Sequence, residues 1–378
     1  MAGEVVVTTL ETRDGRELKR VRLHAERSLN ALDESMIASL QPALEQWSTD
    51  DRVAGVFLEG TGERAFCAGG DVVGVYGAMV GQPVGAPCPE GEAYFAAEYR
   101  LDYTIQTYPK PIVTWGDGLV LGGGTGLLAG SSHAVVTERS RLGMPELPLG
   151  LFPDVGATFF LNRLPGRLGY YLGLTGVHVH GTDIFRLGLA DYVIRSDQRE
   201  AVVTALQEAQ WGDDGRSRHE AASRALAKVQ ERFDATGPAP LAAAYERIQR
   251  LTDHATPGAV MDAIRTAAAS EETLDVAVQG LDRGCPVSQA LFDRQYRSGW
   301  SLSLVECFRR EFAMAVNAVR GPDFREGVRA LLVDKDRAPQ WSAPSLAQVP
   351  DATVDAYFQL PADYPVHPLA DLTTTPDS

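Results

Sequence analysis

Short apolar segments in the first half of the chain end at glycines and are followed by segments with helical periodicity. The segment 53–58 leads to Gly60, while the segment 111–115 leads to a run of glycines at 122–124. The stretch 91–108 between them has the spacing and length of a helix. Strands that alternate with helices are typical of α/β proteins built from repeated units, so we expect this fold class for the first half.

The second half of the chain has a different pattern. From about residue 196, long alanine-rich segments with helical spacing follow one another, including 217–233 and 301–319. We therefore predict three parts: a core at 1–195, a helical region at 196–345 and a C-terminal tail at 346–378. Because prolines interrupt the tail, we expect it to be frayed or to lie along the surface.

Local signals predict element boundaries near the N-terminus. The dipeptide Asp14-Gly15 separates the apolar segments 5–10 and 18–23, and such a dipeptide is a strong turn signal in a β-hairpin. Asp33 and Asp71 each precede a helical pattern, and aspartate is a favoured N-cap residue. We therefore predict a hairpin, followed by helices that begin after these two acids.

The charge of the chain excludes some partners. Its 35 basic and 50 acidic residues give a net charge of −15. A strongly acidic protein is a poor partner for nucleic acid or for an anionic membrane, so we expect neither. No apolar run approaches the roughly 18 residues of a transmembrane helix.

The N-terminus and the cysteines indicate a reducing compartment. The first residues lack the apolar segment of a secretory signal, so we expect a cytoplasmic protein. The four cysteines are spread over the chain without CxxC spacing, which argues against a zinc site or a disulfide framework. Cys67 stands beside two glycines and is interpreted as a small buried apolar residue rather than a nucleophile.

Two glycine clusters follow strand patterns and precede helical ones. One contains Gly69 and Gly70, and the other is the run 122–124. Such turns expose backbone N–H groups at the positive end of a helix dipole, where a phosphate or a developing oxyanion can bind. The alternative is that the glycines serve only tight turns and close packing.

Two carboxyl groups stand eight residues apart in an apolar, proline-rich stretch, at Glu146 and Asp154. A carboxyl group among apolar neighbours has a raised pKa and can act as an acid, a base or a nucleophile. In the alternative interpretation Glu146 is a surface acid in a turn, and Asp154 is the N-cap of the following segment.

These motifs together resemble the crotonase (enoyl-CoA hydratase/isomerase) superfamily. The resemblance rests on three signatures, in the family's order and spacing, and covers roughly residues 5–345. The signatures are the segments 66–71, 121–124 and 144–146. Within the superfamily the finer match is to the 3-hydroxyisobutyryl-CoA hydrolase group, carried by 144–156, 168–170, 174–176, 323–330 and 334–336.

The resemblance implies a crotonase-like spiral of ββα units with an added C-terminal helical region. It also implies that the N–H groups of Gly70 and Gly123 hold the carbonyl oxygen of an acyl-CoA thioester. Glu146 and Asp154 fall on the two carboxylate positions of the hydrolase group. Glu146 then acts as a general base or as a nucleophile that forms a mixed anhydride, while Asp154 orients the water or the β-hydroxyl of the acyl group.

Two further residues enter through the same resemblance. Glu98 falls on a third acidic position that contacts substrate, although it also fits a solvated helix acid near Arg100. Arg64 falls where relatives carry a basic residue near the CoA phosphates, and Arg27 is a weaker candidate. CoA then enters as part of the substrate, and we expect no separate cofactor or metal.

One departure from the hydratase pattern separates two activities. Hydratases carry a second glutamate three residues after the middle glycine of the triplet, and this chain has Gly126 there. We therefore predict an acyl-CoA thioester hydrolase, with valine breakdown as the implied pathway. Enoyl-CoA hydration or isomerisation remains the first alternative, and a non-catalytic acyl-CoA-binding protein the second. A homo-oligomer is possible.

Overall fold

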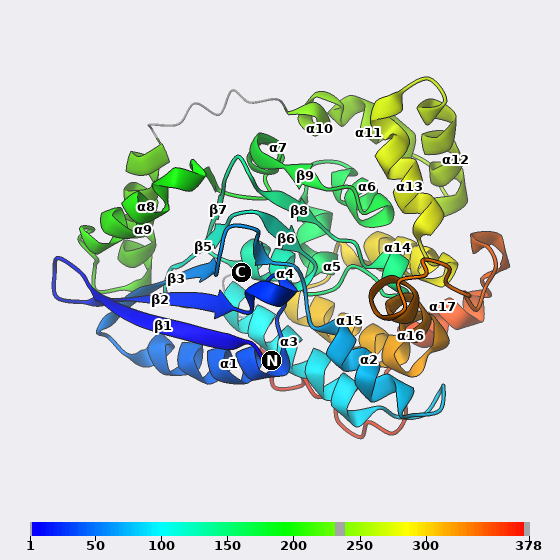
Figure 1. Ribbon diagram of the computed structural model, residues 1–378, viewed down its shortest axis with the longest axis horizontal. Helices are drawn as coiled ribbons and strands as arrows, with labels where there is room; N and C mark the ends of the chain where they lie inside the picture. The colour runs from blue at the N-terminus through cyan, green and yellow to red at the C-terminus, as the bar shows by residue number, and fades with distance from the viewer. Residues whose placement is uncertain (1, 231–238, 374–378) are drawn as a thin grey trace. The chain divides into compact units, whose positions relative to one another are not determined.

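The computed structural model describes residues 2–230 and 239–373 (Figure 1). The chain forms two compact units, each assembled from three stretches of sequence. The first unit comprises Met1–Gly70, Leu101–Leu142 and Val179–Ala243, and the second comprises Asp71–Arg100, Gly143–His178 and Ala244–Ser378. The predicted division into 1–195, 196–345 and 346–378 separates the chain into continuous parts, whereas each unit combines three separate stretches. These units do not test it, so it stays a prediction.

The first unit is built on a six-stranded sheet in the order β1-β2-β3-β5-β7-β10. Its strands are β1 (Glu4–Glu11), β2 (Glu17–His24), β3 (Val53–Gly60), β5 (Ile112–Gly116), β7 (His133–Val136) and β10 (Tyr192–Val193). β1 and β2 form the predicted antiparallel hairpin, in which Val7 lies opposite Val21 (Figure 1). The pairings from β2 to β10 are parallel, as alternating strands and helices predict.

A second, four-stranded sheet has the order β4-β6-β8-β9. Its strands are β4 (Ala65–Cys67), β6 (Leu119–Leu121), β8 (Arg141–Gly143) and β9 (Val179–His180). β4 and β6 are parallel neighbours, and each leads into one of the glycine turns. These strands have two or three residues each, too few to show a period, so the sequence did not predict them as strands.

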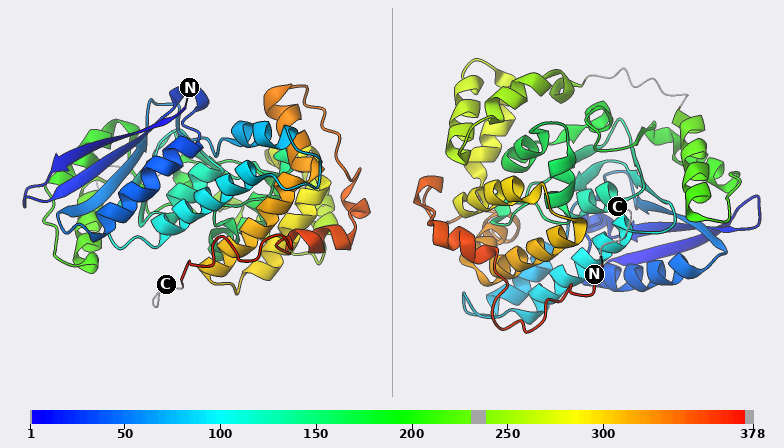
Figure 2. Two further views of the ribbon diagram at one scale, coloured as in Figure 1. Left: turned by 90° about the horizontal axis from the view of Figure 1, so that it is seen from below. Right: turned by 180° about the vertical axis from the view of Figure 1, so that it is seen from behind.

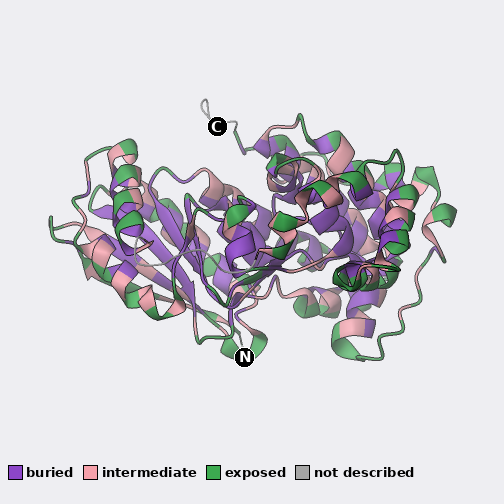
Figure 3. Cartoon of the chain, turned by 90° about the horizontal axis from the view of Figure 1, so that it is seen from above, coloured by how far each residue is buried: buried purple, intermediate pink, exposed green. Residues whose placement is uncertain are grey.

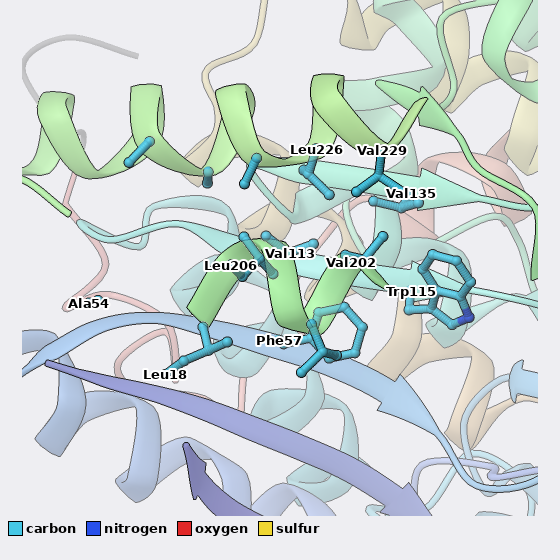
Figure 4. Close-up of a cluster of buried hydrophobic side chains, with 14 of the residues drawn as sticks. Leu18, Ala54, Phe57, Val113, Trp115, Val135, Val202, Leu206, Leu226 and Val229 are labelled. Atoms are coloured by element: carbon cyan, nitrogen blue, oxygen red, sulfur yellow. The ribbon is translucent and has the colours of Figure 1, made fainter. Parts of the chain in front are cut away.

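Helices of the first unit bury the apolar faces of the larger sheet, among them α8 (Arg199–Gln207) and α9 (Gly215–Gln230). The other helices of this unit are α1 (Glu34–Thr49), the last part of α3 (Pro89–Gln106), α4 (Gly123–Gly130), α7 (Gly181–Arg186) and α10 (Pro240–Ala243). Leu206 of α8 and Leu226 of α9 pack with Phe57 and Trp115 of the sheet (Figure 4). Every residue of β3 is buried, as expected of a parallel strand covered on both faces (Figure 3).

The predicted helix starts are correct. The Asp33 side chain accepts a hydrogen bond from Met36 N at 2.9 Å, and that of Asp71 accepts one from Gly74 N at 3.0 Å. The helix predicted at 217–233 is α9 in the first unit, and its last three positions lie outside the described residues. No helix in the described part of the chain is long and apolar enough to cross a membrane.

The second unit is mostly helical. Its helices are α2 (Val72–Val80), the first part of α3 (Pro89–Gln106), α5 (Ala157–Phe160), α6 (Leu168–Thr175), α11 (Tyr245–Thr252), α12 (Pro257–Ala268), α13 (Asp275–Arg283), α14 (Pro286–Gly299), α15 (Leu304–Arg320), α16 (Pro322–Val328) and α17 (Asp351–Tyr357). α15, predicted at 301–319, begins with a capping box between Ser303 and Glu306.

Of the two expectations for the C-terminal segment, the structure supports a segment that lies along the surface, and it is anchored there rather than frayed up to residue 373. Residues 351–357 form α17, and Leu369 is fully buried. The Arg309 guanidinium of α15 donates to the carbonyl oxygens of Leu369, Ala370 and Leu372 at 3.0, 2.8 and 2.8 Å. The segment runs along helices of the second unit up to residue 373 (Figure 2). Proline spacing does not reveal such anchors, because they come from α15.

A buried histidine of the first unit predicts acid sensitivity. His133 Nε2 lies 3.0 Å from Ser223 Oγ, and its ring stacks on that of His219 with centroids 5.6 Å apart. Burial lowers the pKa of His133 from 6.5 to about 4. The unfolded chain therefore binds this proton first, so stability is lost as the pH falls from 6.5 to about 4.

We expect His133→Gln to reduce this loss, which amounts to about 3 kcal/mol if each pKa unit contributes roughly 1.4 kcal/mol. Thermal unfolding followed between pH 7 and pH 4 measures it. His24→Gln, at an exposed histidine, is the matched control. Identical acid profiles for wild type and His133→Gln would contradict the assignment.

Candidate active site

The two glycine turns meet in the first unit. β4 and β6 run parallel as neighbours, so the turns that follow them emerge at the same edge of the sheet. A Cβ placed on Gly69 would lie 4.0 Å from Gly123 N. A Cβ on Gly124 would overlap the carbonyl oxygen of Cys67 and lie 2.9 Å from its carbonyl carbon. The close approach of the turns therefore requires glycine at 124.

The turns also adopt backbone conformations that favour glycine. Gly69 has φ 111° and Gly122, the residue before α4, has φ 51°. Gly123 is the first residue of α4, so its N–H has no acceptor within that helix and lies at the positive end of its dipole. A backbone hydrogen bond holds the residue before Gly70, because Leu32 N donates to Gly69 O at 2.8 Å.

The three carboxyl groups predicted from the sequence are all buried in the second unit. Glu98 lies on α3, Glu146 immediately precedes the short 3-10 helix Leu147–Leu149, and Asp154 lies in the buried turn before α5. Their exposed fractions are 2%, 4% and 4%. The alternatives of a solvated helix acid at Glu98 and a surface acid at Glu146 are therefore wrong. Asp154 is not the N-cap of α5 either, because that position belongs to Gly156.

Burial raises the pKa values of all three groups, and repulsion between acids adds to the increase for Glu98 and Glu146. Burial is the largest cause for each of them. The charge of Asp154 further raises the pKa of Glu98 and of Glu146, and both pKa values lie well above the usual range. Burial raises the pKa of Asp154 to about 7. A hydrogen bond from Tyr99 favours the carboxylate and limits this increase.

Hydrogen bonds orient two of the three acids. Tyr99 Oη donates to Asp154 Oδ2 at 2.7 Å, and burial raises the pKa of this phenol, which keeps it a donor. Tyr94 Oη lies 3.3 Å from Glu98 Oε1. Glu146 Oε2 has no hydrogen-bond partner among residues 2–230 and 239–373. The hydrogen-bonding capacity of this buried oxygen is therefore not used within those residues.

The sequence did not single out Tyr99 or Glu311. Glu311 Oε2 and Oε1 accept the backbone N–H groups of Gly156 and Thr158 at 2.7 and 2.8 Å. A sequence signal for Glu311 does exist, because it stands between Phe308 and Phe312 on the buried face of α15. A glutamate on such an apolar stripe indicates a specific buried partner.

The other predicted residues lie in the first unit. Gly70 and Gly123 belong to the turns described above, and Arg64 is an exposed residue immediately before β4. Arg27 is also exposed. The structure thus brings Gly70 and Gly123 into one pair of turns, and Glu98, Glu146 and Asp154 into one cluster of acids.

Other features of the chain do not add to these groups. All four cysteines lie within the described residues, where each is buried and none forms a disulfide. Among those residues no group of three His, Cys, Asp or Glu side chains is arranged to hold a metal ion. A pocket of about 700 Å³ in the second unit is lined by residues of α12, α13, α14 and the stretch 344–354, and by none of the three buried acids.

Comparison with known proteins gives the class of this chain. A sequence model of the enoyl-CoA hydratase/isomerase family matches residues 18–358. The chain therefore belongs to this family, and the crotonase-like α/β fold predicted from its motifs is confirmed.

Individual relatives have different names. The mitochondrial 3-hydroxyisobutyryl-CoA hydrolase of Danio rerio is 35% identical over 343 residues, which cover 89% of this chain and 86% of the relative. The small ribosomal subunit protein mS47 of Neurospora crassa is 33% identical over 369 residues, covering 92% and 71%. A crystal structure of a carnitinyl-CoA dehydratase from Mycobacterium thermoresistibile matches with a TM-score of 0.81 and 31% identity, covering 95% of this chain and 97% of that one.

Proposed function

We propose that this protein hydrolyses the thioester of a short β-hydroxyacyl-CoA, such as 3-hydroxyisobutyryl-CoA, to the free acid and CoA. The observation that carries the proposal is the cluster of buried acids, in which Glu146 keeps an oxygen atom without a partner among the described residues. The names of relatives such as the Danio rerio protein support the same chemistry. Binding alone has no use for several acids in an apolar interior, since each is costly to bury.

In this proposal the N–H groups of Gly70 and Gly123 donate to the thioester oxygen. Their hydrogen bonds strengthen as the carbonyl carbon becomes tetrahedral, and loss of one such donor costs about 3 kcal/mol of transition-state stabilisation. The convergence of the two turns in the first unit supports this role, because it requires glycine where a side chain would push the turns apart. Arg64, immediately before β4, is proposed to bind a CoA phosphate.

Glu146 is proposed to direct the attack. As a general base it takes a proton from water, and the hydroxide adds to the carbonyl carbon. As a nucleophile it forms a mixed anhydride, which water then opens. In both routes the C–S bond breaks and the sulfur leaves as the thiol of CoA. Asp154, held by Tyr99, is proposed to orient the water or the β-hydroxyl of the substrate.

The acids also provide a physical basis for choosing a hydroxyacyl group. Glu98 and Asp154 are the candidates for pairing with the β-hydroxyl. A substrate that lacks the hydroxyl would leave one of these buried acids without its hydrogen-bond partner. The free-energy cost of that unpaired group strongly disfavours such a substrate. At the position where hydratases carry their second glutamate, α4 has Gly126, so the pair of acids that holds water at a carbon–carbon double bond is incomplete. This favours C–S cleavage over hydration.

Thiol release from a panel of CoA esters tests the proposal. We expect 3-hydroxyisobutyryl-CoA to be hydrolysed faster than isobutyryl-CoA or acetyl-CoA. Because Glu146 must be ionised to act as base or nucleophile, and burial raises its pKa, kcat/KM should rise as the pH increases above the range where an exposed glutamate ionises. Faster hydration of crotonyl-CoA than thiol release would favour the hydratase alternative. Binding of every ester without turnover would favour the non-catalytic one. The cytoplasmic location, the lack of a separate cofactor and the oligomeric state stay predictions.

A further inference from the structure

The turn that carries Asp154 has an unusual backbone. Val155 has φ 52° and Gly156 has φ 86°, so two successive residues lie in the left-handed region. A β-branched residue rarely adopts this conformation, which costs about 1–3 kcal/mol and persists only where surrounding structure holds it. Strain of this kind gathers at functional sites, and here it immediately follows a proposed active-site acid.

Two helices hold this turn. Glu311 of α15 accepts the N–H groups of Gly156 and Thr158 with its two carboxyl oxygens. Gln295 of α14 donates from Nε2 to Pro153 O at 2.7 Å and to Thr158 Oγ1 at 2.8 Å. Both side chains are buried, with exposed fractions of 0% for Glu311 and 1% for Gln295. The turn is therefore fixed on both sides of Asp154.

Burying a carboxyl group to accept these two N–H groups costs free energy of desolvation. Burial raises the pKa of Glu311 to about 8, and the charge of Asp154 contributes to the increase. Burying a glutamine would cost less free energy, but its side chain offers only one acceptor oxygen to the two N–H groups. The two donors of the turn thus account for the presence of a carboxyl group in the apolar stripe of α15.

We propose that Glu311 is a positioning residue that holds the 153–158 turn, so that Asp154 stays in hydrogen-bond contact with Tyr99 within the cluster of buried acids. The consequence for catalysis rests on the proposed function, whereas the consequence for the geometry of Asp154 does not. Glu311 itself takes no part in the bond changes.

Glu311→Gln tests the proposal with little change in shape. One of the two N–H groups then faces an amide donor instead of an acceptor, so the turn should relax. We expect kcat for thioester hydrolysis to fall roughly 10- to 100-fold, as for a misplaced active-site group, with KM within about twofold of wild type. Glu311→Asp, which keeps two oxygens on a shorter side chain, should lose less.

Asp183→Asn is the matched control. Asp183 is 1% exposed and accepts the N–H groups of Leu241 and Ala242 at 3.0 and 2.9 Å, so it performs the same task in the first unit. Both variants should lower the unfolding temperature, but only Glu311→Gln should lower kcat when rates are normalised to folded protein. Equal kcat values for the two variants would overturn the catalytic part of the proposal.

Crystal structures of wild type and Glu311→Gln test the geometry without any assay. We expect the Tyr99–Asp154 hydrogen bond, 2.7 Å in the wild type, to be lost in the variant. An unchanged turn with this bond intact would overturn the proposal. If wild type hydrolyses no CoA ester, the proposed function fails, and the crystal structures alone decide whether Glu311 positions Asp154.

Discussion

Glu146→Gln is expected to reduce kcat for thioester hydrolysis by about 10²–10⁴-fold, the usual contribution of a positioned acid or base. The amide cannot accept a proton from water and cannot form an anhydride, so both proposed routes fail. Affinity for the CoA ester should stay near that of wild type, because the side chain keeps its shape. Thiol release and calorimetric titration with the ester measure the two quantities.

The same substitution should stabilise the protein at alkaline pH. Burial raises the pKa of Glu146, so the neutral form is favoured in the fold and stability is lost as the pH rises above the range where an exposed glutamate ionises. Glu146→Gln should therefore raise Tm at pH 8 and change it little near pH 4. Glu90→Gln, at an exposed position on α3, is the control. Full activity in Glu146→Gln would remove the proposed mechanism.

Gly124→Ala is expected to damage both stability and activity. The added methyl group meets the backbone of Cys67, which cannot move as a flexible side chain would. Overpacking of this kind costs about 1–3 kcal/mol, sometimes more. Because the turns must separate, the N–H of Gly123 should shift, and loss of one such donor lowers kcat by about 10²–10³-fold. Thermal unfolding and thiol release, normalised to folded protein, measure the two effects.

Gly77→Ala is the matched control for this substitution. Gly77 lies within α2, and a Cβ there has no neighbour within 4 Å among the described residues. Alanine is a better helix former than glycine by about 1 kcal/mol, so this variant should be slightly more stable and fully active. If Gly124→Ala retains wild-type Tm and kcat, the close approach of the turns is not required.

Signals confined to neighbouring residues predicted much of the fold. The Asp14-Gly15 turn between two apolar segments predicted the hairpin, and Asp33 and Asp71 marked helix starts correctly. The order and spacing of the glycine and Met-Pro-Glu motifs predicted the family. Glu146 and Asp154 stood out because acids are rare in such apolar surroundings.

Contacts between distant residues decided the rest. Whether Glu98 is solvated or buried depends on elements packed around α3, and local spacing carries no information about them. The bond from Thr158 to Glu311 joins residues 153 positions apart, and that from Tyr99 to Asp154 joins residues 55 apart. The sequence by itself determined the family, the turns and two of the buried acids. Only the tertiary structure brought Tyr99 and Glu311 to Asp154, because their partners are fixed by packing rather than by the order of residues along the chain.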